Sequence, residues 1–298
     1  MFELLKRHLN PESESSRRSA LGGALAAATM APALLSATGA RAAEPIRSEF
    51  KFFADDEEAF RAHFRFERDL VDQGETVSWY HFTVYAVAAG ARPAPFVRFE
   101  GMEYSYFRRI APLTYRIHAH NLSFPRDLAT ADLTRAAVNP ITGATVKVPP
   151  TVLTEDPGVI DSPKGYLTLD NPNGVPVKSY AMYRIEGDLM RREHIRAAPA
   201  SWPTMFIESS TAWVDLAMFN DPKITSLPVH TSGFYIAPWP RWMEMGDRPG
   251  HMIGVWTGRK LGSAAELPAD YRAQAQTEYP ELLSARWSEL DRPLKVKL

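Results

Sequence analysis

The side chains best suited to proton transfer cluster in Tyr115–His120, which reads Tyr-Arg-Ile-His-Ala-His. If this segment is a β-strand, Arg116, His118 and His120 share one face, because side chains alternate along a strand. Imidazole groups titrate near neutral pH and can act as general acid or general base. We therefore expect an acid–base site here. A strand side that faces solvent would show the same pattern and stays open as the alternative.

Two histidines at positions i and i+2 can also bind one metal ion when a third ligand completes the set. His118 and His120 have this spacing, but no third ligand stands at a diagnostic spacing. Candidates for it are Glu186, His194 and Glu244. We predict no cofactor and keep a divalent metal on His118 and His120 as an alternative. The predicted catalytic residues are His118, His120, Arg116 and Tyr104.

The most unusual segment is Trp239–Gly250, which reads Trp-Pro-Arg-Trp-Met-Glu-Met-Gly-Asp-Arg-Pro-Gly. Tryptophan and methionine offer large, adaptable apolar surfaces, and proline lowers the entropy lost when a loop becomes ordered. The segment is therefore either a rigid plug at one end of the β-structure or a wall of an apolar pocket. For the second case the predicted substrate-binding residues are Trp239, Trp242, Arg241, Glu244 and Met245.

Three motifs together resemble a known family: the turn Asn-Pro-Ile-Thr-Gly at 139–143, the Trp239–Gly250 loop, and Glu-Leu-Pro at 266–268. They are similar to an uncharacterised family catalogued as domain of unknown function 1838. Arg241 stands where that family more often has another proline. The resemblance extends over most of the chain after the N-terminal segment. It implies an exported or soluble β-rich domain and supplies no reaction.

Strands have to position these residues, because segments rich in β-branched and aromatic residues alternate with turn signals along the chain. Expected strands cover 77–88, 96–107, 113–122, 166–169, 177–186, 205–219, 233–236 and 251–257. A helix is expected at each end, over 55–73 and 268–290. We predict a mainly β fold, α+β at the termini: one antiparallel β-barrel or sandwich of calycin-like size with flanking N- and C-terminal helices.

Composition excludes several classes of protein. The 298 residues include 34 Lys and Arg against 35 Asp and Glu, and no cysteine. Balanced charge argues against a nucleic-acid partner. Without cysteine there are no disulfides, thiolate metal sites or cysteine nucleophiles. The glycine-rich nucleotide-binding motifs and the nucleophile elbow are also missing, which disfavours nucleotide-dependent dehydrogenases, P-loop enzymes and α/β-hydrolases.

The N-terminal residues 1–42 have the features of an export signal. Arg17 and Arg18 precede a mild apolar run, and Ala40-Arg41-Ala42 forms a small-residue cleavage site. The paired arginines resemble the twin-arginine class. The run is too short and too rich in glycine and alanine for a stable membrane anchor. We expect the export machinery as a partner, a periplasmic or secreted location, and a single domain over 43–298; a homo-oligomer is compatible with the sequence.

These observations lead to a ranked set of functions. The first is an exported enzyme that performs non-redox acid–base chemistry, of lyase, isomerase or hydratase type, on an apolar or aromatic small molecule. A non-catalytic carrier for such a ligand is the alternative. A metal-dependent barrel enzyme that uses His118 and His120 is the second alternative.

Overall fold

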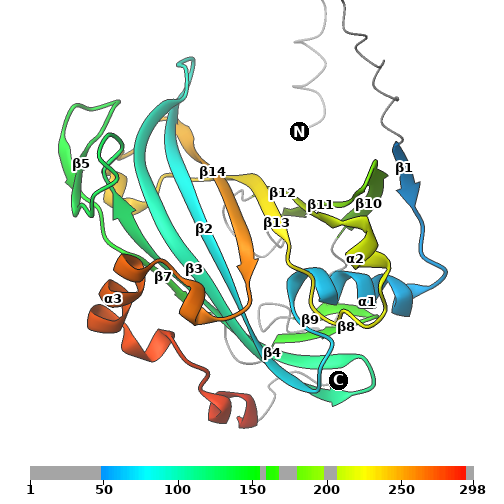
Figure 1. The fold of residues 1–298 in the computed structure, drawn as a ribbon. Helices are drawn as coiled ribbons and strands as arrows, with labels where there is room; N and C mark the ends of the chain where they lie inside the picture. Colours follow the sequence, from blue (N-terminus) through cyan, green and yellow to red (C-terminus); the bar gives the residue numbers. More distant parts are fainter. Residues whose placement is uncertain (1–47, 155–158, 168–179, 198–206, 293–298) are drawn as a thin grey trace, which may run out of the picture. The chain divides into compact units, whose positions relative to one another are not determined.

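The computed structural model describes residues 48–154, 159–167, 180–197 and 207–292 (Figure 1). By backbone contacts the chain divides into Met1–Pro45 and Ile46–Leu298, and every described residue belongs to the second unit. The expected signal segment, 1–42, lies outside the described residues. In the part of the chain that is described, no helix is long and apolar enough to cross a membrane.

The described strands form one large antiparallel sheet and a small hairpin (Figure 1). In spatial order the main path is β1 (Ser48–Lys51), β10 (Tyr180–Glu186), β11 (Leu189–Ala197), β12 (Ile207–Asp215), β13 (His230–Ala237), β14 (Gly250–Leu261), β2 (Gln73–Ala88), β3 (Ala94–Ala111), β4 (Thr114–Arg126), β8 (Val159–Ser162) and β9 (Gly165–Leu167). A further strand, β7 (Thr151–Thr154), also pairs with β4, and β5 (Ala136–Val138) pairs with β6 (Thr145–Lys147).

The prediction of a mainly β, antiparallel fold is confirmed, but its barrel alternative is wrong. A barrel requires the two end strands to pair with each other. Among the described strands, β1 pairs with β10 and β9 pairs with β8, so the sheet stays open. The predicted strands coincide with β2, β3, β4, β9, β10, β12, β13 and β14. Residues 168–169, 177–179 and 205–206 of these predictions lie outside the described residues.

The first helix, α1 (Asp56–Glu67), begins where its sequence signals place it. The Asp55 carboxylate accepts a hydrogen bond from the Glu58 backbone N–H at 2.8 Å, and acidic residues fill the first turn. The expected helix continued to residue 73, but α1 ends at Glu67. Beyond that point the backbone N–H of Leu70 donates to the Thr225 carbonyl at 3.0 Å, so a tertiary contact replaces the helical bond.

The two faces of the sheet have different covers. On the side that we call the α1 face, Phe107, Tyr115 and Ile117 pack against Phe60 and Phe64 of α1. On the side that we call the C-terminal face, residues of β2, β3 and β4 pack against α3 (Ala269–Glu278) and the 3-10 turns η4 (Pro280–Leu282) and η5 (Trp287–Asp291). Figure 1 shows α3 and the following turns beside β3 and β4. The expected continuous helix over 268–290 breaks at Pro280, which cannot continue a helix.

A second short helix, α2 (Leu216–Asn220), follows β12, where the expected strand ran on to residue 219. Asp215 explains the change, because its carboxylate accepts hydrogen bonds from the N–H groups of Ala217 and Met218. This is a helix N-cap, and it outweighs the β-rich composition of the preceding residues.

Candidate functional site

The predicted catalytic histidines lie in the core of the C-terminal face. His118 is 1% exposed and His120 is fully buried. The His120 ring stacks on Tyr104 with 5.3 Å between centroids, and its Nε2 lies 2.6 Å from the Leu282 carbonyl oxygen. Burial lowers the pKa of His120. The solvent-facing interpretation of this strand side is therefore wrong, and His120 connects the sheet to the C-terminal segment.

The other two predicted catalytic residues are buried as well. The Tyr104 hydroxyl donates a hydrogen bond to the Glu75 carboxylate, and the Tyr106 ring packs between His118 and Trp287. Arg116 is 6% exposed and pairs with β8. Strand alternation placed Arg116, His118 and His120 on one face, and all three are buried together with Tyr104.

A metal site would need a third ligand beside the two histidines. The His118 and His120 ring centroids are 6.2 Å apart, and no group of three or more His, Asp or Glu side chains in the described ranges is placed to hold a metal ion. Glu186, His194 and Glu244 belong to β10, β11 and the Trp239–Gly250 loop, which the sheet order separates from β4.

The Trp239–Gly250 loop packs against the ends of β2 and β3. Met243 and Met245 are buried among Val84, Ala86 and Phe96. The short turn η2 (Arg241–Met243) ends at Glu244, whose backbone is left-handed with φ 52°. This packing supports the interpretation of the loop as a plug.

The predicted substrate-binding residues of this loop have different environments. Met245 is buried, whereas Arg241 and Glu244 are exposed. Trp239 is half-buried and its indole N–H donates to the Arg248 carbonyl at 2.9 Å. The Trp242 ring lies 6.2 Å from that of Phe99, and Met245 and Trp239 belong to the same packed cluster.

Asn139, from the Asn-Pro-Ile-Thr-Gly turn, holds the loop in place. Its side chain is fully buried, and its amide nitrogen donates to the Met243 carbonyl at 2.7 Å. Its amide oxygen accepts from the backbone N–H groups of Ile141 and Thr142. Two motifs that the resemblance singled out separately therefore contact each other through one side chain.

The α1 face carries three aromatic rings that lie across glycines of neighbouring strands. A Cβ atom built on Gly101 would lie 2.8 Å from the Tyr80 ring, one on Gly233 would lie 2.8 Å from the Trp256 ring, and one on Gly254 would lie 2.1 Å from the Tyr235 ring. No real side chain tolerates these distances. Glycine is therefore required at these positions for the space it leaves, since all three lie in strands.

These rings lie on one face of the sheet, where Trp256 is the direct strand partner of Phe82. Phe82 stacks on Phe99 at 4.9 Å, and its ring lies 6.0 Å from Tyr235 and 6.1 Å from Tyr80. The side chains that we call the aromatic surface are Tyr80, Phe82, Phe99, Tyr235 and Trp256. All except Phe99 are half-buried, so that they retain accessible area.

Polar groups lie at one point of this surface. The Tyr80 hydroxyl donates to the Asn121 amide oxygen at 3.2 Å and lies 3.0 Å from the Ser123 hydroxyl. Burial raises the pKa of Tyr80, and the negative charge of Glu103 raises it further. Glu103 is paired in register with Asn121 on the adjacent strand. A phenol, an amide and a carboxylate therefore meet beside apolar rings.

A charged cluster joins α1 to the same face. Arg192 of β11 donates to the Glu67 carboxylate and lies 3.2 Å from Nδ1 of His63, whose Nε2 is 3.6 Å from Asp161. The cationic environment holds the pKa of Glu67 well below its usual value, against the opposing effect of burial. Because its members pair with one another, this cluster fixes the helix on the sheet.

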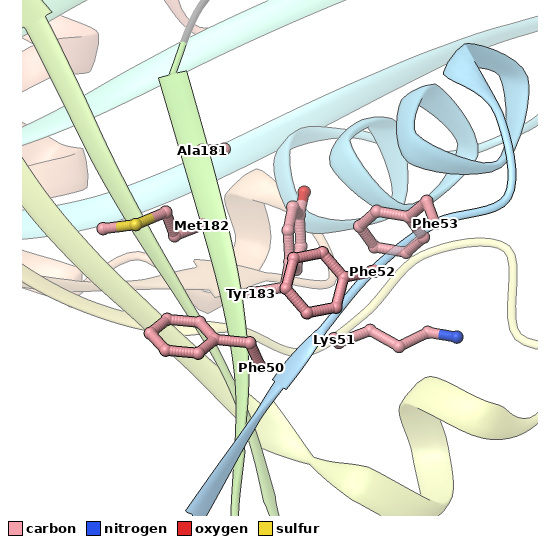
Figure 2. Close-up of a pocket in the computed structure, with 7 residues that line it drawn as sticks. All are labelled: Phe50, Lys51, Phe52, Phe53, Ala181, Met182 and Tyr183. Atoms are coloured by element: carbon pink, nitrogen blue, oxygen red, sulfur yellow. The ribbon is translucent and has the colours of Figure 1, made fainter.

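Two pockets are described, and neither includes a predicted catalytic or substrate-binding residue. The first, of about 370 Å³, lies at the β1–β10 edge between Phe50 and Tyr183. Figure 2 shows Phe50 and Met182 on one side of β10, with Phe53 and the Tyr183 ring toward α1. The second, of about 550 Å³, is shallow and is formed mainly by the side of β12–β14 that is opposite the aromatic surface.

The aromatic surface was missed by sequence reasoning, although a signal for it exists. Tyr80 and Phe82 alternate along one strand, and Gly254, Trp256 and Gly258 alternate along another. Strand glycines at alternate positions mark a face where something approaches the backbone closely. Only the register, which pairs Tyr80 with Gly101 and Gly258, shows that the approaching groups are aromatic.

The fold and site therefore define an open antiparallel sheet with an aromatic surface on its α1 face. Residues 207–295 match the model of a family described as "Protein of unknown function (DUF1838)". This match starts at β12, includes the Trp239–Gly250 loop and the C-terminal segment, and supports the resemblance found in the sequence; the Asn139 turn lies upstream of it. A search of curated proteins found no match.

Proposed function

We propose that this protein binds a small aromatic or otherwise apolar molecule on the aromatic surface and performs non-redox acid–base chemistry on it. The observation that carries the proposal is the set of three half-buried rings, those of Tyr80, Tyr235 and Trp256, which lie across strand glycines on one face of the sheet. Ligand sites are mostly apolar with a few placed polar groups, which is the composition found here. Acid–base roles on His118 and His120 are less well supported, because core packing occupies both rings.

A binding assay with matched variants tests this proposal. Titration of tryptophan fluorescence with a panel of aromatic and terpenoid compounds identifies ligands, and Trp256→Ala should weaken their binding about tenfold, or about 1.4 kcal/mol. Trp213→Ala is the control, since Trp213 is a half-buried tryptophan of β12 on the opposite face, where its ring stacks on His230. Equal affinity in folded Trp256→Ala and Trp213→Ala would contradict the proposed surface.

A non-catalytic carrier is the second candidate, and the same surface favours it. A carrier needs the apolar contact of Phe82, Tyr235 and Trp256 but no proton transfer. Recovery of every bound compound unchanged after long incubation, judged by mass spectrometry and chirality, would favour the carrier over the enzyme.

We further propose export through the twin-arginine machinery and cleavage after Ala42, with a periplasmic or secreted product. The support is the order of features in 1–42: paired arginines, a weakly apolar run and a small-residue site.

A further inference from the structure

We propose that Asn121 and Glu103 form a proton-transfer site for a carbonyl compound, in which the Asn121 amide holds the carbonyl oxygen and the Glu103 carboxylate takes a proton from the adjacent carbon. This inference rests on the proposed function, because it needs an aromatic ligand on the aromatic surface. It names the substrate class, an aromatic ketone, and the class of reaction, enolisation.

The hydrogen bonds of Tyr80 determine which group Asn121 offers to a ligand. The Tyr80 hydroxyl donates to the amide oxygen of Asn121. With that oxygen engaged, the NH₂ group is the part of the amide that remains to donate. Asn121 is half-buried and lies on the face of the sheet that carries the rings. A ligand oxygen that accepts hydrogen bonds, such as a carbonyl, is its natural partner.

The strand register places a carboxylate opposite this donor. Glu103 on β3 is the direct partner of Asn121 on β4, and both side chains belong to the α1 face. Direct partners in an antiparallel pair have Cβ atoms about 5 Å apart. A carbonyl oxygen and the hydrogen on the adjacent carbon of one ligand can therefore reach the donor and the base at once. Tyr80 holds the amide and Ser123 hydrogen-bonds to the Tyr80 hydroxyl, so both act as positioning residues.

The proposed step balances without any cofactor. Glu103 removes a proton from the carbon next to the carbonyl, the C–H electron pair forms a C=C bond, and the carbonyl π pair moves to the oxygen. The Asn121 N–H group stabilises this oxygen as negative charge develops, as preorganised donors do in enzymes. The Glu103 carboxyl then returns the proton to the same or to a conjugated carbon, which restores or isomerises the ketone.

Hydrogen–deuterium exchange of a defined probe tests the step. The probe is 2-acetylnaphthalene in D₂O with the full chain, followed by proton NMR of the methyl group; 2-ethylnaphthalene serves as the matched hydrocarbon for binding. We expect exchange to be faster with protein than with buffer, and to fall at least tenfold in Glu103→Gln and in Asn121→Ala. Glu193→Gln, a half-buried strand carboxylate on the other face, should keep the original rate.

Binding and exchange are measured separately, so that a failure of the proton-transfer inference can be distinguished from a failure of the proposed function. Binding of both compounds without protein-dependent exchange overturns the inference and leaves the proposed function standing. Failure of both compounds to bind overturns the proposed function for this ligand class, and the inference with it. Circular dichroism melts identify unfolded variants, and Glu103→Ala provides a second variant: a folded Glu103→Gln or Glu103→Ala with unchanged exchange excludes Glu103 as the base.

Discussion

At the scale of single residues, Gly101 controls the aromatic surface. A Cβ atom there would lie 2.8 Å from the Tyr80 ring, 2.7 Å from the Leu122 carbonyl oxygen and 2.5 Å from the Ser123 hydroxyl. Two of these atoms cannot move without breaking strand pairing or the Tyr80 hydrogen bonds. Overpacking of this kind costs about 1–3 kcal/mol.

We therefore predict that Gly101→Ala lowers the free energy of unfolding by about 1–3 kcal/mol and weakens ligand binding in the protein that remains folded. Urea unfolding and ligand titration measure the two effects. Gly262→Ala is the control, because a Cβ atom there meets only the end of the Glu266 side chain. Equal stability of the two variants would show that Tyr80 does not depend on Gly101.

Asn139 is the residue on which the Trp239–Gly250 loop depends. Asn139→Ala leaves the buried Met243 carbonyl without its donor and should cost about 1–3 kcal/mol. Asn139→Asp should cost more, because a carboxylate cannot donate to that carbonyl and would be buried as a charge. Thermal unfolding measures both variants, and the fluorescence of the folded variants reports whether Trp242 leaves Phe96 and Phe99. Thermal stability equal to that of the original protein would contradict this role.

At the scale of elements, Lys260 connects β14 to the end of α1. Its Nζ donates to the carbonyl oxygens of Arg65 and Arg68, both at 2.8 Å, where the C-terminal end of a helix favours a cation or a donor. Burial nevertheless lowers the pKa of Lys260 to about 7. In the unfolded chain a lysine titrates at about 10.4.

This difference predicts how stability depends on pH. Between pH 7 and about 10 the unfolded chain binds the proton that folded Lys260 has lost, so the free energy of unfolding rises with pH across this window. Lys260→Met should remove that rise, and Lys147→Met, at an exposed position of β6, should keep it. Urea unfolding at several pH values measures the slope. An identical slope in Lys260→Met would mean that Lys260 is charged in the folded protein.

The elements also show how far sequence reasoning reaches. Local signals sufficed at the start of α1, where acidic residues follow the Asp55 cap. The prediction failed at Pro280, which interrupts the expected helix over 268–290 although this signal is local. Local signals failed at the end of α1, where the Thr225 carbonyl, far along the chain, takes the hydrogen bond of Leu70. They also missed β11, because Arg191, Arg192 and Glu193 make its sequence look polar. Its Arg192 is buried only because α1 supplies Glu67.

The candidate site depends even more on long-range pairing. Strand alternation correctly placed His118 and His120 on one face of β4. That this face is buried depends on Leu282 and Trp287, which lie more than 150 residues later in the chain and pack against it. Gly101, Asn121 and Ser123 lie beside Tyr80 only because β2, β3 and β4 pair in one particular register. Composition and spacing cannot supply that register.

At the scale of the whole molecule, the proposed export route has to suit the folded unit that it would carry. The twin-arginine route carries folded proteins, and the unit Ile46–Leu298 contains groups that need a complete fold. Examples are the buried Arg192–Glu67 contact and the buried Asn139 side chain, which join segments far apart in sequence. A signal of this class therefore suits a chain whose long-range contacts can form before transport.

Replacement of the paired arginines tests this expectation. The change Arg17→Lys with Arg18→Lys keeps the charge but removes the paired guanidinium groups. We expect the variant to stay in the cytoplasm as the uncleaved precursor, while the original chain appears outside it and begins at Ala43. Cell fractionation and N-terminal sequencing measure both. Unchanged export of the variant would contradict the twin-arginine class and leave a general secretory signal, whereas retention of both chains would contradict export itself.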